Sequence, residues 1–206
     1  MGLAVSVGDY SVALREGDDT EWMDEQFALV NSVLMRNGLP QHHEPSTVPE
    51  VNYSSCIGFP YSFLHYLRRI YARSRLGKSA EPVSGDDITA EDEKDIEQVS
   101  ELADSHLLYH SDCEGLYLPM ELKVPLVDDD LPGGALGSTQ GLLKELEAIA
   151  SLIDIEFVDG APTEASLESL AEFNEDHPYH IERVVWHSLF ENCQLSMKFG
   201  AAIVFG

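Results

Sequence analysis

Four residues near the middle of the chain have the side chains of a metal site: His106, His110, Asp112 and Cys113. Imidazole and thiolate are good zinc ligands, and a His/His/Cys set with one open position resembles a catalytic zinc arrangement. The two histidines alternate with other side chains, so in a strand both would point to the same face. A small metal-dependent hydrolase built on these four residues is therefore one hypothesis for the function of this chain.

The spacing of these residues matches no metal motif of known chemistry. The chain has no H-E-x-x-H, no paired C-x-x-C units and no H-x-E…P-C-x-x-C deaminase pattern. Two β-like runs flank the polar segment 111–115, which ends in glycine, and this pattern predicts a hairpin whose turn residues bond their own backbone. Acidic neighbours on both sides of Cys113 disfavour a thiolate nucleophile. We therefore expect no cofactor, with zinc at this hairpin as the alternative.

The charge of the chain is large, negative and unevenly distributed. It holds 12 Lys and Arg against 37 Asp and Glu, a formal net charge of −25 over 206 residues. Residues 1–78 carry 7 basic and 9 acidic side chains, whereas residues 79–206 carry 5 and 28. A field of this sign repels nucleic acid and anionic membranes and attracts basic proteins. We therefore expect a basic protein partner, no nucleic acid and no membrane, with adaptation to high salt as the alternative origin of the acidity.

Two acidic segments are the candidates for the partner-binding surface. One lies in and before a predicted helix at 89–104, and the other is a triple aspartate in a Pro/Gly-containing loop. The triple aspartate lacks the alternating D-x-D-x-D spacing and the terminal Glu of a calcium loop, so it is better explained as a solvated acidic loop. The predicted partner-binding residues are Asp86, Asp87, Glu91, Asp92, Asp95, Asp128, Asp129 and Asp130.

Hydrophobic periodicity predicts an α+β or mixed α/β fold, with about six helices packed on a small sheet of short strands. The helices are expected near 20–37, 60–75, 89–104, 138–153, 163–173 and 178–199. Strands are expected within 3–14, as a strand or short hairpin, in the central hairpin at 106–119, and at 155–158 and 201–205, with loops at 39–58 and 123–137. The length favours a single domain, 1–206, with a possible division into a near-neutral lobe, 1–78, and an acidic lobe, 79–206.

The helix predicted at 60–75 carries most of the positive charge of the first lobe. Arg68, Arg69, Arg73 and Arg75 form its basic side. A basic stripe alone is weak evidence for polyanion binding, and the acidic field around it opposes such binding. We therefore expect this helix to dock against the acidic second half of the same chain.

Three segments give the chain a resemblance to known proteins: His110–Pro119, Leu136–Gln140 and Ala202–Phe205. They resemble a group of uncharacterised small acidic bacterial proteins of immunity type, and that resemblance implies an inhibitor of a basic toxin. It attaches no function to any residue.

The hypothesis that follows is a bacterial, cytoplasmic, non-enzymatic protein that binds a basic partner. An acidic subunit of a larger assembly is the third alternative, and the oligomeric state stays open. The cytoplasmic expectation rests on the absence of a secretory signal pattern and of any long apolar run. It also rests on three widely spaced cysteines, which indicate free thiols.

Overall fold

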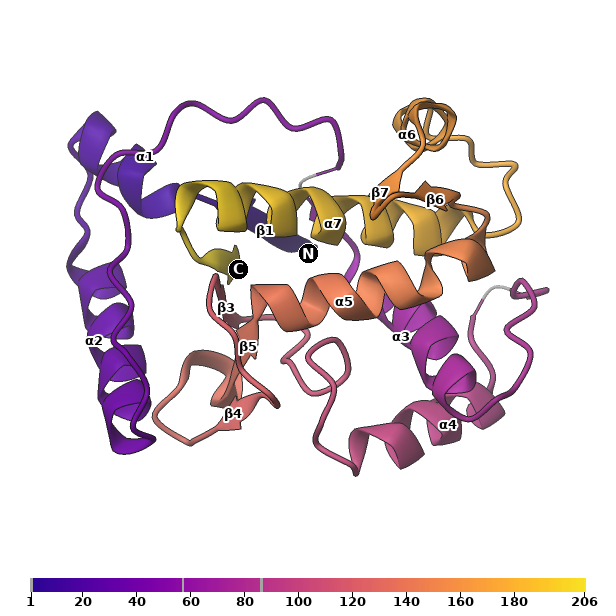
Figure 1. Ribbon diagram of the computed structural model, residues 1–206, viewed down its shortest axis with the longest axis horizontal. Helices are drawn as coiled ribbons and strands as arrows, with labels where there is room; N and C mark the ends of the chain where they lie inside the picture. Colours follow the sequence, from indigo (N-terminus) through magenta and orange to yellow (C-terminus); the bar gives the residue numbers. More distant parts are fainter. Residues whose placement is uncertain (1, 57, 86) are drawn as a thin grey trace.

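The computed structural model describes residues 2–56, 58–85 and 87–206, and it confirms an α+β fold (Figure 1). The α-helices in this part of the chain are α1 Asp9–Glu16, α2 Glu21–Arg36, α3 Tyr61–Arg75, α4 Ala90–Ser100, α5 Thr139–Ile149, α6 Glu164–Ala171 and α7 His180–Phe199. Short 3₁₀ turns follow at Pro132–Gly134 and Ala150–Ile153. No helix among the described residues is long and apolar enough to cross a membrane.

The strands form one mixed six-stranded sheet and one small hairpin. They are β1 Leu3–Val7, β2 Gly58–Phe59, β3 Gly115–Leu118, β4 Leu126–Val127, β5 Ala135–Ser138, β6 Phe157–Val158, β7 Ala161–Pro162 and β8 Ile203–Phe205. The order in the large sheet is β2-β1-β8-β3-β5-β4, and β6 pairs with β7. Only the β3–β5 pair is parallel within the described sheet. The first and last strands therefore meet near the middle of the sheet.

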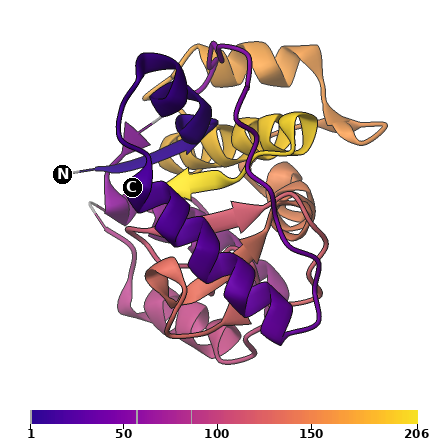
Figure 2. The same ribbon diagram turned by 90° about the vertical axis from the view of Figure 1, so that its left-hand side faces the viewer.

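Helices cover both faces of this sheet, because side chains alternate along each central strand. Tyr117 and Ile203 face a large apolar cluster formed with α3, α5 and α7. Leu116 and Leu118 point the other way and pack with α2, whose buried residues include Val33. Figure 2 shows α2 lying across the front of β8, β3 and β5, with α7 and α5 behind them. The sheet is therefore the middle layer of three.

The N-terminal segment differs from the predicted strand or hairpin. Its strand ends at Val7, and Gly8 takes a left-handed conformation with φ of 90°. That backbone angle favours glycine and redirects the chain into the short helix α1. The prediction of six helices therefore missed one. The helices predicted near 20–37, 60–75, 89–104, 138–153, 163–173 and 178–199 are all present.

The central hairpin prediction is wrong. Residues 106–110 form turns, and only Gly115–Leu118 is a strand, paired with β8 and β5 instead of with the preceding segment. The loop predicted at 123–137 also contains β4 and most of β5. A parallel partner can lie far away in sequence, so the apolar run at 115–118 did not reveal which strand it pairs with.

Candidate functional site

The two histidines of the predicted metal site are both buried in the core, and each has its own set of contacts. The His106 ring packs against Gly141, where an added Cβ would lie 2.0 Å from a ring carbon. Its Nδ1 accepts a hydrogen bond from the Ser138 N–H at 3.1 Å, and its Nε2 donates to the Leu122 carbonyl at 3.2 Å. Burial lowers the pKa of His106. A neutral imidazole that already uses both nitrogens has no lone pair left for a metal.

His110, Asp112 and Cys113 have separate surroundings. His110 stacks on the Tyr117 ring with 4.1 Å between ring centroids, and burial lowers its pKa to about 4. Asp112 is bound by the buried guanidinium of Arg68, and Cys113 lies exposed on the loop. Among the described residues, no three His, Cys, Asp or Glu side chains come close enough together to hold a metal ion.

The basic helix α3 docks against the acidic half of the chain, as the sequence predicts. Arg73 Nη1 lies 3.0 Å from Asp92 and 3.3 Å from Asp95, and Lys78 Nζ lies 2.6 Å from Asp95. Arg69 bonds Glu182 of α7 at 3.1 Å. Asp92 and Asp95 are only 4% and 3% exposed. These two predicted partner-binding residues are therefore part of an internal ion-pair network and not of the surface.

The remaining predicted partner-binding residues differ in their surroundings. Asp86 is outside the described residues. Asp87 and Glu91 are exposed, and Glu91 is 3.5 Å from Lys78. Arg36 of α2 bridges Asp128 and Asp130 at 3.0 and 2.9 Å, while Asp129 between them is exposed. The triple aspartate is therefore partly neutralised from within the molecule.

Two rows of exposed glutamates stand out on the surface, and we call them the α4 row and the α6 row. The α4 row is Glu93, Glu97 and Glu101, and the α6 row is Glu164, Glu168 and Glu172. Each row repeats every four residues, which places its members on one helix face about 6 Å apart along the axis. The four-residue spacing is visible in the sequence. The acidic segment that we predicted in and before the helix at 89–104 contains the α4 row, but the prediction did not single out its members, and it missed the α6 row.

The glutamates of these rows destabilise the helices that carry them. Like charges four residues apart destabilise a helix, and a negative charge near a helix C-terminus opposes the helix dipole. Neither α4 nor α6 has a basic residue in its last turn. In both views the two helices lie at opposite edges of the molecule, α6 at the top and α4 at the bottom (Figures 1 and 2). Their carboxylates are available for contact with another molecule.

Internal contacts hold most of the basic groups that could neutralise these rows. The side chains that bind carboxylates of the same chain are Arg36, Arg68, Arg69, Arg73, Arg75, Lys78 and Lys144. Arg183 is buried and donates to the carbonyls of Ile153 and Asp154 at 3.1 and 2.8 Å. The surface consequently keeps a strong negative field.

Fold and surface together define an acidic α+β protein that presents ordered carboxylates on its surface. The chain belongs to the family described as "Putative DNA-mimic protein", whose model matches residues 1–205. No curated protein matches the chain, and no solved structure does. The family supports acidic mimicry and protein binding, and it does not specifically support the immunity assignment or a toxin as the partner.

Proposed function

We propose that this protein binds the DNA-binding surface of a basic protein and thereby excludes DNA from it. The observation that carries the proposal is the pair of exposed glutamate rows on α4 and α6. Carboxylates at regular intervals on a rigid helix can occupy the positions that phosphates take in a Lys- and Arg-lined groove. The interaction would be intracellular, in the cytoplasm where DNA-binding proteins are accessible.

The net charge of the protein would also make association with the partner faster. A net charge of −25 steers a basic protein toward the surface and raises the association rate at low ionic strength. The rows then supply local contacts. A more specific form of this proposal is an immunity-type inhibitor of a nuclease-like or other basic toxin, which the segregated charge and the resemblance to immunity-type proteins suggested from the sequence.

The test is capture followed by competitive elution. The immobilised protein is incubated with a lysate of the cells that encode it, and bound proteins are eluted with a 20-base-pair DNA duplex at constant ionic strength. We expect elution of a basic protein that binds DNA. Neutralising the α4 row in E93Q/E97Q/E101Q, or the α6 row in E164Q/E168Q/E172Q, should weaken capture about tenfold, because charge pairs across the interface are lost.

The matched control is E16Q/E50Q/E156Q, which removes the same charge from three scattered, exposed positions. This control should weaken capture much less than either row variant if the arrangement of the carboxylates matters. Equal losses in all three variants would show attraction by net charge alone and contradict mimicry. A captured protein that DNA cannot displace would also contradict it.

A further inference from the structure

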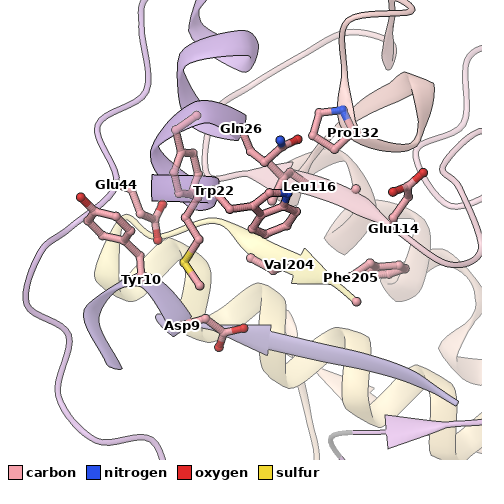
Figure 3. Close-up of a pocket in the computed structure, with 14 residues that line it drawn as sticks. Asp9, Tyr10, Trp22, Gln26, Glu44, Glu114, Leu116, Pro132, Val204 and Phe205 are labelled. Carbon is pink, nitrogen blue, oxygen red and sulfur yellow. The ribbon is translucent and has the colours of Figure 1, made fainter. Parts of the chain in front are cut away.

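A second candidate site lies at the end of the molecule away from the glutamate rows. Figure 3 shows a pocket between α1, the first turns of α2 and the ends of β3 and β8. Its cavity volume is about 240 Å³. Its apolar wall includes Phe27, Leu116 and Phe205. A cavity of this volume has room for one large side chain.

An exposed tryptophan lies over this pocket. Trp22, in the first turn of α2, is 63% exposed, whereas Trp186, the other tryptophan of the chain, is fully buried. Figure 3 shows the indole of Trp22 between α2 and β8. Two other aromatic rings line the same pocket, where Tyr10 packs edge-on against Phe27 with 6.0 Å between ring centroids. An exposed indole face at the rim of an apolar pocket is a surface on which a planar cation can stack.

Carboxylates surround the same aromatic face. Glu44, Asp9 and Glu114 line the pocket. No lysine or arginine is among its described lining residues. The Glu44 side chain is 5% exposed, and its Oε2 binds His42 Nε2 at 2.6 Å and accepts the Ala202 N–H at 2.9 Å. Within the described chain, Glu44 Oε1 and the Glu114 carboxylate accept no hydrogen bond. Acceptor oxygens therefore remain for an entering donor.

We propose that this pocket receives an arginine side chain of the basic partner. The indole would stack on the guanidinium plane, the apolar wall would cover the methylene stem, and the carboxylates would accept the guanidinium hydrogens. Charge complementarity selects this occupant over a neutral apolar group. The inference rests on the proposed function for the nature of the partner, but the pocket itself can be tested without that partner.

The test titrates the full-length protein with n-butylguanidinium, a probe for the arginine side chain, and with n-butylurea, its neutral counterpart. Binding is followed by amide chemical shifts at constant ionic strength. We expect n-butylguanidinium to bind in roughly the millimolar range, as suits so small a ligand, and about fivefold more tightly than n-butylurea. The shifts should map to the pocket residues.

Two substitutions of exposed side chains separate the stacking and charge contributions. W22L keeps apolar bulk but removes the aromatic face, and E114Q removes one carboxylate of the rim; each should weaken n-butylguanidinium binding several-fold. E50Q, an exposed carboxylate outside the pocket, is the matched control and should change nothing. A folded spectrum of each variant confirms that the loss is local.

Equal affinity for the two probes, or no saturable binding of either, would overturn the inference. So would n-butylguanidinium binding that W22L and E114Q leave unchanged. These outcomes are independent of the DNA-competition experiment. Loss of guanidinium selectivity with DNA-displaceable capture intact would reject the arginine pocket alone, whereas selective binding without such capture would retain the pocket and reject mimicry.

Discussion

Asp92 shows how one acidic residue can stabilise the fold instead of serving a partner. Its carboxylate accepts the Thr89 N–H at 3.0 Å as part of a capping box at the start of α4. The same carboxylate lies 3.0 Å from Arg73 and 3.9 Å from Arg69. Burial raises the pKa of Asp92, but the Thr89 hydrogen bonds and the two guanidinium groups lower it by more, so that it lies below its usual 3.8.

The pH dependence of stability follows from this lowered pKa. A carboxylate with a lower pKa in the folded state stabilises fully above the unfolded value, near 3.8, and loses that contribution as the pH falls through the folded value. We expect D92N to lower the free energy of unfolding by about 3 kcal/mol at pH 7, because the arginines lose a buried counter-ion. Urea unfolding at pH 7 and pH 2.5 measures this, and the deficit should shrink at pH 2.5. A deficit independent of pH would refute the assignment.

Helix α4 has two acidic faces with opposite roles. Asp92 and Asp95 face α3 and form ion pairs, while the α4 row faces solvent and repels itself. An arrangement that lowers local stability at an exposed site is typical of function, because a charge selected only for solubility could be placed elsewhere.

Because the glutamates of the α4 row repel one another, we expect that neutralising the end of this row stabilises the protein. E97Q/E101Q removes a like-charge pair and two negative charges near the helix C-terminus. We expect the free energy of unfolding to rise by about 0.5–1 kcal/mol at low ionic strength and to change little in 1 M NaCl, where such interactions are screened. Thermal unfolding at both salt concentrations is the measurement. Destabilisation at low salt would mean that these glutamates make structural contacts.

The sequence predicts those parts of the molecule that depend on local patterns. Every long helix was predicted, and so was the docking of the arginines on acidic groups, since both depend on residue spacing or opposite charge. β5 could not be recognised, because it is a four-residue strand buried on both faces and Gly137 packs under the Tyr117 ring. The pocket beside Trp22 combines six separate segments, and only tertiary contacts bring them together.

At the scale of the whole molecule, one apolar cluster includes residues from Leu3 to Phe205 and joins α3 to α5 and α7. We propose that the chain unfolds as a single cooperative unit, although its charge divides it near residue 78. The fluorescence of buried Trp186 and the far-ultraviolet circular dichroism should therefore change over the same range of urea concentration. Two separated transitions would indicate that a near-neutral lobe and an acidic lobe fold independently.

The position of β8 between β1 and β3 has a consequence for biosynthesis. Residues 203–205 lie between β1 and β3 in the sheet, yet the ribosome adds them after both of these strands. Until then, a nascent chain exposes the unpaired edges of β1 and β3, together with the apolar side chains that β8 will cover. Exposed strand edges are prone to wrong pairing, so the acidic surface, which keeps neighbouring chains apart by repulsion, would also protect the unfinished protein from aggregation.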